Sequence, residues 1–323
     1  MTKNNKILVT GAAGFIGSHT CQKLLDLEYN VVGIDNLNDY YDHQLKEYNL
    51  SILNMDPNFR FYHVDICNIA DLQTVFRNGE FKGIIHLAAQ AGVLFSLKNP
   101  FLYQKTNIEG TLNILELCRL NSVKNMIFAS SSSVYGDRKE VPFKEEAPID
   151  QPISLYAATK QAGEALCYTY SHLYDFKINC LRFFTVYGPR GRPDMAPHKF
   201  THAILTNKPI KYYDTSTSQI ARDFTYIDDI IEGIMLSLTY WKGFEIFNLG
   251  FGSPLRTIDF IRTIEELTGI KAQIEFVGRQ PGDVAVTYAD TSKAKQLLGF
   301  SPHTSVKEGM KKYLEWFRDY YNV

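Results

Sequence analysis

The stretch that decides the fold runs from 7 to 17 and reads ILVTGAAGFIG. A short apolar run passes into three glycines, Gly11, Gly14 and Gly17, and a segment with helical spacing follows. Glycine permits a tight turn, a close approach of backbone to phosphate, and close packing of a helix on a sheet. The N–H groups and positive dipole end of the helix favour an anion. The stretch therefore predicts a strand–turn–helix unit that binds a dinucleotide pyrophosphate.

The first half of the chain alternates short β-branched runs with longer helical segments. The strands are continuously apolar, which is typical of a parallel sheet covered on both faces. This alternation predicts an α/β fold with a doubly wound parallel sheet of the Rossmann type. The expected strands are 7–9, 31–34, 59–64, 84–87, 126–129 and 178–183, and the expected helices are 16–27, 69–77, 103–121 and 155–174, with a polar loop after the second strand.

The regular alternation stops after Phe183, where glycines and prolines crowd one loop. Shorter elements follow, with a helix expected at 227–240, a strand at 245–249 and an amphipathic helix at 306–320. We therefore expect a Rossmann domain over 1–183, to which 224–250 returns, and a smaller C-terminal α/β substrate-binding lobe over 184–323.

Composition and charge exclude several classes of protein. The 323 residues carry a formal net charge of −1 and include 45% hydrophobic residues. Without a block of like charges or 18 consecutive apolar residues, neither a nucleic acid nor a membrane is an expected partner. The first residues lack the apolar run of a signal peptide, and the five cysteines lack metal or redox spacing. We expect a cytoplasmic protein with reduced cysteines and no metal.

The second strand ends at an acid, Asp35, which suits the ribose of a bound dinucleotide. A carboxylate there accepts hydrogen bonds from the ribose hydroxyls and repels a 2′-phosphate. The next residue is Asn36 rather than arginine, so we expect NAD rather than NADP. The residues expected to line the cofactor are Gly11, Gly14, Phe15, Ile16, Gly17, Asp35, Asn36, Asp65, Ile66, Leu87, Ala88 and Ala89, together with Tyr156 and Lys160.

A candidate for the chemical step lies on the helix that begins near 155. Tyr156 and Lys160 are four residues apart and share a helix face. A lysine ammonium stabilises a nearby phenolate and lowers its pKa, so the tyrosine becomes a usable base. Tyr135 and Lys139 have the same spacing but precede a charged, proline-bounded loop, and we expect no catalytic role for them. Ser131 belongs to a serine run at the end of the fifth strand, where ligands bind in such folds.

Taken together, these residues resemble the extended short-chain dehydrogenase/reductase superfamily over essentially the whole chain. The resemblance implies a resident NAD, a catalytic set of Ser131, Tyr156 and Lys160, and a nucleotide sugar held by the C-terminal lobe. It also implies a structural role for Asn107 at the cofactor site. Members commonly form homodimers through helices that match 103–121 and 155–174, so a homodimer is expected.

The serine run separates chemistries within this superfamily. Dehydratases carry Thr-Asp-Glu at the places of Ser131, Ser132 and Ser133, and nucleotide-sugar decarboxylases carry glutamate at the place of Ser133. This chain has no acid there. The resemblance therefore implies epimerisation, with Ser132 and Ser133 at the substrate.

Four further segments are similar to the UDP-glucuronate 4-epimerase branch: NDYY at 38–41, FTVYGP at 184–189, GRPDMA at 191–196 and QPGDV at 280–284. The resemblance implies that Arg192 and Thr185 hold the sugar carboxylate, a contact that suits the bidentate geometry of arginine. It also assigns the pyrophosphate to Arg222 and the uridine ribose to Asp283. Gln280 stands where hexose epimerases often have an arginine, which leaves part of the diphosphate contact open.

The function expected from these residues is an NAD-dependent 4-epimerase that interconverts UDP-glucuronate and UDP-galacturonate through a 4-keto sugar. Tyr156 takes the proton of the 4-hydroxyl, Ser131 aligns it, and the cofactor carries the hydride. Three alternatives stay open at this point. They are a 4-epimerase of a neutral UDP-hexose or UDP-N-acetylhexosamine, a decarboxylating UDP-glucuronate enzyme, and a non-catalytic NAD-sensing protein, because fold alone does not settle function.

Overall fold

The structure is a computed structural model that describes residues 5–213, 220–278 and 284–323. The chain divides into two compact units. The first unit comprises 1–136, 148–182 and 231–247, and the second comprises 137–147, 183–230 and 248–323. The segment 137–147 thus belongs to the second unit although the first surrounds it in sequence.

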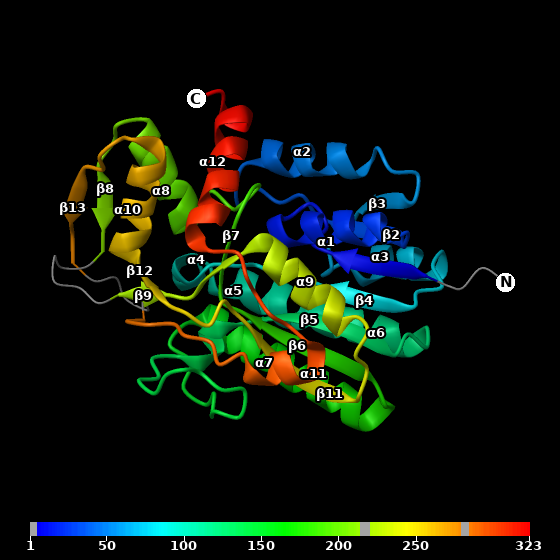
Figure 1. Ribbon diagram of the computed structural model, residues 1–323. Coiled ribbons are helices and arrows are strands. Elements are labelled where there is room, and N and C mark those ends of the chain that lie inside the picture. The colour runs from blue at the N-terminus through cyan, green and yellow to red at the C-terminus, as the bar shows by residue number, and fades with distance from the viewer. Residues whose placement is uncertain (1–4, 214–219, 279–283) are drawn as a thin grey trace. The chain divides into compact units, whose positions relative to one another are not determined.

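A seven-stranded sheet forms the centre of the first unit, in the order β11-β6-β5-β4-β1-β2-β3 (Figure 1). The pairs β1–β2, β1–β4, β2–β3 and β4–β5 are parallel. This is the doubly wound order of a Rossmann fold, with β11 added at one edge, so the predicted fold class is confirmed. The strands are β1 Lys6–Thr10, β2 Asn30–Asp35, β3 Phe59–His63, β4 Gly83–His86, β5 Asn125–Ser131, β6 Lys177–Phe183 and β11 Phe244–Leu249.

Helices supply the apolar side chains that bury the sheet. Side chains from α3, α6 and α7 pack with Leu8, Ile34 and Ile84 of the strands in one hydrophobic core. The first unit contains α1 Phe15–Asp26, α2 His43–Leu53, α3 Ile69–Arg77, α4 Val93–Lys98, α5 Pro100–Tyr103, the π-helix η1 Gln104–Glu109, α6 Gly110–Leu120, the 3-10 helix η2 Ser132–Tyr135 and α7 Leu155–Tyr174, and α9 Ile227–Ser237 leads into its last segment.

Two expectations for these helices were wrong. The stretch after Asp35 was expected to be a polar loop, but it contains α2, whose first turn is capped by the Asp42 carboxylate accepting from Gln44 N at 2.9 Å. The helix buries Leu45 and Leu53, which stand among many polar residues in the sequence. The single helix expected over 103–121 is instead α5, η1 and α6 in succession, because the helix widens into a π-helix around Asn107.

In its described residues, the second unit contains three small two-stranded sheets and four helices. The strands pair as β10–β7 and β13–β8, both parallel, and β12–β9, antiparallel. The buried Asp223 carboxylate holds two turns together, accepting from the backbone N–H groups of Phe251, Gly252 and Ala289 at 2.7–3.1 Å. The elements are β7 Thr185–Tyr187, β8 Ile210–Tyr212, β9 Ala221–Arg222, β10 Phe224–Tyr226, β12 Leu255–Arg256, β13 Ile274–Phe276, α8 Ala196–Leu205, α10 Thr257–Thr268, α11 Ser292–Leu298 and α12 Val306–Tyr321.

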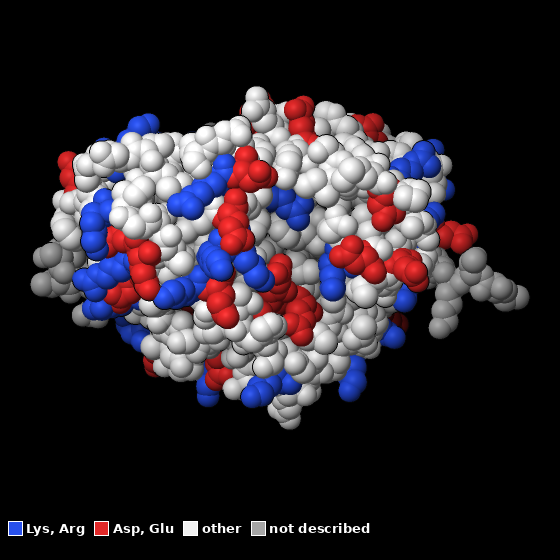
Figure 2. Space-filling view, turned by 45° about the horizontal axis from the view of Figure 1, so that its top comes forward, with Lys and Arg blue, Asp and Glu red and all other residues white. Residues whose placement is uncertain are grey.

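The surface agrees with a net charge near zero. Figure 2 shows acidic and basic side chains next to one another on the face drawn, without a broad area of one sign. Within 5–213, 220–278 and 284–323, none of the helices has the length and apolarity needed to cross a membrane. The five cysteines are present as thiols, and four of them are buried.

Candidate active site

The glycine turn leaves no room for side chains at two of its positions. Gly11 has a positive φ of 71°, and a Cβ there would lie 2.9 Å from the Ala88 nitrogen. A Cβ on Gly17 would lie 1.9 Å from the Gly11 oxygen. Gly14 is the N-cap of α1, and no side chain among the described residues caps that helix, whereas Ser154 caps α7. The turn therefore presents helix N–H groups that suit a phosphate.

Asp35 and Asn36 lie at the carboxyl end of β2, beside this turn. The Asp35 carboxylate accepts from Ala13 N at 3.2 Å and from Leu37 N at 2.9 Å. Burial raises its pKa, while the positive charge of Lys46 acts in the opposite direction. Asn36 Nδ2 donates to Asp65 at 3.0 Å, which joins the ends of β2 and β3. The predicted ribose and adenine residues are thus brought together at one sheet edge.

The backbone that follows β4 lies against the glycine turn. Leu87 N and Ala88 N both donate to the Thr10 hydroxyl, at 3.1 and 3.0 Å. Asn107, buried in η1, pairs with both backbone groups of Gln90: Gln90 N donates to its Oδ1 at 2.7 Å, and its Nδ2 donates to the Gln90 carbonyl at 3.0 Å. These contacts fix the course of residues 87–90, which include residues 87–89, predicted to lie under the cofactor.

Helix α7 carries the predicted tyrosine and lysine. The Lys160 ammonium is buried and donates to the Ala129 carbonyl of β5 at 2.7 Å. Burial lowers the pKa of Lys160 to about 8. Tyr156 is half-buried, and its ring meets Tyr103 edge to face at 6.2 Å. The lysine hydrogen bond therefore ties the helix of Tyr156 to β5, two residues before Ser131.

The serine run lies where β5 passes into η2. Ser131 is buried at the end of the strand, and its hydroxyl accepts from Ser133 N at 3.2 Å. Ser132 and Ser133 are half-buried in the 3-10 helix. The strand places Ser131 at the same carboxyl edge of the sheet as the turn after β1 and the end of β2.

Two buried charges behind the serine run were missed by sequence reasoning. Arg182 Nε and Nη2 donate to the Glu164 carboxylate at 2.9 and 2.8 Å, and Ser130 donates to the same carboxylate. Arg182 Nη1 also donates to the Tyr135 hydroxyl at 2.9 Å, which holds that tyrosine in the core. An arginine within a mostly apolar strand was the signal that could have revealed this pair, since buried charges are almost always paired.

The residues of the second unit that are predicted to bind the substrate each have their own contacts with neighbouring groups. The guanidinium group of Arg192 binds Asp194 with two nitrogens, at 3.0 and 2.6 Å. Arg222 Nη1 donates to the carbonyls of Ala221 and Ala285, at 2.9 and 3.2 Å. Thr185 is half-buried at the start of β7. Asp283, Gln280 and the adjacent Arg279 lie outside the described residues.

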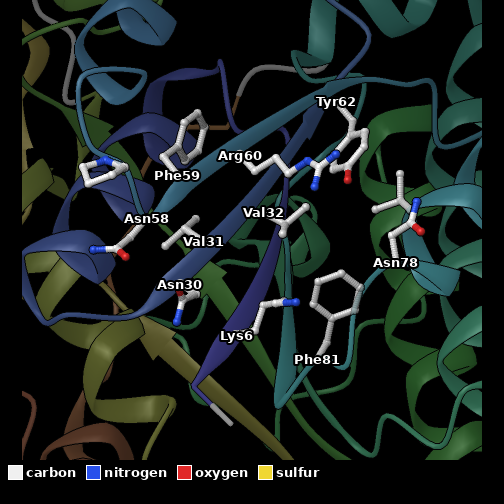
Figure 3. Close-up of a pocket in the computed structure, with 12 residues that line it drawn as sticks. Lys6, Asn30, Val31, Val32, Asn58, Phe59, Arg60, Tyr62, Asn78 and Phe81 are labelled. Atoms are coloured by element: carbon white, nitrogen blue, oxygen red, sulfur yellow. The ribbon is translucent and has the colours of Figure 1, made fainter. Parts of the chain in front are cut away.

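A cavity of about 180 Å³ lies at the amino ends of the strands, opposite the carboxyl ends that carry the candidate site. Figure 3 shows that its lining includes Lys6, Asn30 and Phe59, which stand at the starts of β1, β2 and β3. Ligands of doubly wound sheets bind beyond the carboxyl ends of the strands. This cavity is therefore distinct from the candidate active site, whose residues follow the ends of the same strands.

Comparison with known proteins agrees with this arrangement. The family described as GDP-mannose 4,6 dehydratase matches residues 8–313. A UDP-glucuronate 4-epimerase of Thermodesulfobacterium geofontis is 47% identical over 313 residues, which cover 97% of this chain and 96% of the relative.

Two solved structures are similar along almost their whole length. UDP-glucuronic acid 4-epimerase from Bacillus cereus, in complex with UDP-glucuronic acid and NAD, is 38% identical with a TM-score of 0.91, covering 98% of this chain and 100% of that one. UDP-glucose 4-epimerase from Thermotoga maritima, with UDP-glucose, is 32% identical with a TM-score of 0.89, covering 98% and 99%. The chain belongs to the GDP-mannose 4,6 dehydratase family, within the extended short-chain dehydrogenases/reductases.

Proposed function

We propose that this protein is an NAD-dependent UDP-glucuronate 4-epimerase, which interconverts UDP-glucuronate and UDP-galacturonate. The observation that carries the proposal is the buried Lys160, held against β5 beside a serine run without an acid, on the helix of Tyr156. The relatives named UDP-glucuronate 4-epimerase, and the Bacillus cereus structure with NAD and UDP-glucuronic acid, support the same substrate and cofactor.

The first unit offers residues that fit NAD. The glycine turn and the start of α1 would hold the pyrophosphate, because no side chain among the described residues caps the first N–H groups of α1, and such groups favour an anion. Asp35 would bind the adenosine ribose, and the residue directly after it is Asn36 rather than an arginine that could bind a 2′-phosphate. Bound there, NAD supplies a reversible hydride acceptor. The complete proposed set is Gly11, Gly14, Phe15, Ile16, Gly17, Asp35, Asn36, Asp65, Ile66, Leu87, Ala88, Ala89, Asn107, Tyr156 and Lys160.

Three side chains would perform the proton chemistry. Tyr156, as phenolate, takes the proton of the sugar 4-hydroxyl and later returns it. The Lys160 ammonium favours the phenolate by its charge, which burial makes more effective than in water. Ser131 donates to and aligns the oxygen at C4, which becomes a carbonyl in the 4-keto intermediate. Proton removal by a positioned base of this kind accelerates reactions about 10²–10⁴-fold.

The substrate carboxylate needs its own binding site, because the 4-keto form of a glucuronate is a β-keto acid that can lose CO2. We propose that Arg192 and Thr185 hold this carboxylate in the ring plane, where the C–C bond is poorly aligned for cleavage. The fork of Arg192 already accommodates one carboxylate, that of Asp194. Ser132 and Ser133 would contact the sugar without supplying an acid, while Arg222 and Asp283 would bind the diphosphate and the uridine ribose.

We also propose a division of labour between the units and a homodimer. The first unit would carry the cofactor and catalytic residues, and the second would carry the uridine nucleotide. Leu112 and Leu120 on α6 and Tyr168 on α7 are exposed at 39%, 61% and 58%, which suits helices buried in a dimer. Light scattering after size exclusion should give a dimer, and the substitution Leu112→Glu should give a monomer. A monomeric wild-type protein would refute the dimer.

The function is tested by incubating the purified protein with UDP-glucuronate and following the products by chromatography and mass. We expect a product of unchanged mass that is identified as UDP-galacturonate. A product lighter by CO2 would show a decarboxylase. Turnover of UDP-glucose or UDP-N-acetylglucosamine in place of UDP-glucuronate would retain the tyrosine chemistry and remove the role of Arg192. The variant Tyr156→Phe is the control for adventitious activity.

A further inference from the structure

A chain of buried polar groups runs behind the candidate site and includes a histidine that no step above uses. His86 ends β4, and only 1% of it is exposed. Its Nδ1 lies 2.7 Å from the Thr10 hydroxyl, and its Nε2 lies 3.1 Å from the Thr111 hydroxyl. The ring therefore bridges the last residue of β1 and the first turn of α6, and both of its nitrogens have partners.

The hydrogen bonds of Thr10 decide whether Nδ1 of His86 carries a hydrogen. The Thr10 oxygen already accepts from Leu87 N and Ala88 N. A hydroxyl has one proton and two acceptor positions, so with both acceptor positions occupied it can only donate to its third partner. Thr10 therefore donates to His86 Nδ1, which must carry a lone pair rather than a hydrogen.

The surroundings of Thr111 lead independently to the same tautomer. The Thr111 hydroxyl donates to the carbonyl of Asn107 at 2.7 Å. Its single proton is thereby occupied, so it can only accept from His86, and Nε2 must carry the hydrogen. Burial and the nearby charge of Lys160 lower the pKa of His86 to about 3, so the ring stays neutral at physiological pH. Both ends of the bridge thus require neutral imidazole with its hydrogen on Nε2.

The chain of contacts continues from Asn107 to the helix of the proposed base. Asn107 Nδ2 donates to the Thr159 hydroxyl at 3.0 Å, and Thr159 donates to the carbonyl of Tyr156 at 2.9 Å. At the His86 end of the chain of contacts, Thr10 directly precedes Gly11 and accepts a hydrogen bond from Ala88 N. The same nitrogen lies so close to Gly11 that a Cβ there would collide with it. All of these residues belong to the first unit.

We propose that His86, fixed as the Nε2–H tautomer, is a positioning residue that joins the glycine turn and the segment after β4 to the helix of Tyr156. Its role in catalysis rests on the function proposed above, whereas its tautomer and its effect on cofactor affinity do not. An apolar side chain of similar size would leave the hydroxyls of Thr10 and Thr111 without one partner each. The two backbone N–H groups that Thr10 holds would then be less firmly oriented.

The tautomer is measured on the wild-type protein, so no variant has to fold. Long-range ¹H–¹⁵N spectra of protein labelled with ¹⁵N-histidine distinguish Nε2–H, Nδ1–H and charged imidazole for each of the eight histidines. His86 is assigned by the contacts of its ring protons with Phe128, whose ring lies 5.9 Å away. We expect an Nε2–H ring that does not titrate between pH 5 and about 8. An Nδ1–H or titrating ring overturns the proposal.

Cofactor affinity tests the positioning role without turnover. We expect His86→Leu to raise the dissociation constant for NAD at least tenfold. The dissociation constant of His86→Asn should stay within about threefold of the wild-type value, since the asparagine Oδ1 lies near the former Nδ1 and accepts from Thr10. The matched control is Thr263→Val, which removes the hydroxyl bonded to Asp259 on α10, and NAD affinity should not change. Equal losses in the Leu and Asn variants, or unchanged affinity in both, would refute the role of the Nδ1 acceptor.

The connection to the tyrosine helix is tested by Thr111→Val, which removes the acceptor of Nε2–H. We expect kcat to fall about tenfold with the dissociation constant for NAD unchanged. Unaltered kcat would refute this half of the proposal. If wild-type protein does not convert UDP-glucuronate, the proposed function fails, while the tautomer and the NAD measurements still decide the positioning role.

Discussion

The ion pair between Glu164 and Arg182 offers the sharpest test of how the first unit is held together. The side chains are only 4% and 2% exposed, and two hydrogen bonds join them at 2.9 and 2.8 Å. Glu164→Gln keeps the volume and removes the negative charge, so the guanidinium group stays buried without its counter-charge. Breaking a buried pair from one side costs about 3–5 kcal/mol. For a protein of this size that loss lowers Tm by on the order of 10 °C.

Thermal unfolding followed by circular dichroism measures this effect. The double variant Glu164→Leu with Arg182→Met removes both charges, and it should recover most of the loss, because an apolar replacement of a buried pair is often neutral. The matched control is Glu266→Gln, which breaks the exposed pair with Lys307, whose side chains are 62% and 61% exposed. That change should alter stability by less than about 1 kcal/mol. A Glu164→Gln protein within 1 kcal/mol of wild type by the same measure would refute the reasoning.

Further predictions concern the proposed site. Tyr156→Phe should lower kcat at least about 10²-fold with little change in KM, as steady-state kinetics will show, because it removes the base and leaves the ring. Arg192→Ala should raise KM for UDP-glucuronate about tenfold or more and leave any turnover of UDP-glucose unchanged, since only the carboxylate contact is lost. Lys160 has a folded pKa of about 8 against 10.5 for an ordinary lysine, so the unfolded chain binds more protons between these values. The contribution of Lys160 to the free energy of unfolding therefore rises with pH over that range, whereas kcat falls as the ammonium loses its proton. The first trend is measured by urea unfolding and the second by steady-state kinetics, each as a function of pH. Lys160→Met should abolish both trends. Asp35→Ala should weaken NAD and reduce the preference over NADP, measured by competitive binding, and an unchanged preference would contradict the role of the carboxylate.

Much of the fold could be predicted because its signals are local. The glycine turn between strand and helix, and the continuous apolar strands, identify a doubly wound sheet. The bounds of α7 agree with the prediction of 155–174, because Ser154 is a strong N-cap and the helix has uninterrupted helical spacing. Helix α2 was not predicted because its few buried leucines stand among asparagine, tyrosine and serine, so the apolar spacing of a helix is hard to recognise. Asn107 of the π-helix forms its hydrogen bonds with Gln90, a contact between separate segments that no periodicity of the sequence reveals.

The candidate site likewise has a part that could be predicted from the sequence and a part that could not. Residues within one motif, such as Tyr156 and Lys160, could be identified from their spacing and context. Partners that meet only after folding could not, since Glu164 with Arg182, and His86 with Thr10 and Thr111, are joined by hydrogen bonds between distant elements. The visible signs were an arginine within the mostly apolar β6 and a histidine at the end of the apolar β4. The roles of Ser131, Thr185 and the other proposed site residues stay predictions until they are tested.

The central claim is that the protein inverts C4 of UDP-glucuronate and returns the same hydrogen to that carbon. UDP-glucuronate carrying deuterium at C4 tests it most directly, with the product analysed by mass and by NMR in ordinary water. We predict UDP-galacturonate that retains deuterium at C4 and keeps its carboxylate. A product with the label exchanged for solvent hydrogen, or one that has lost CO2, would contradict the account.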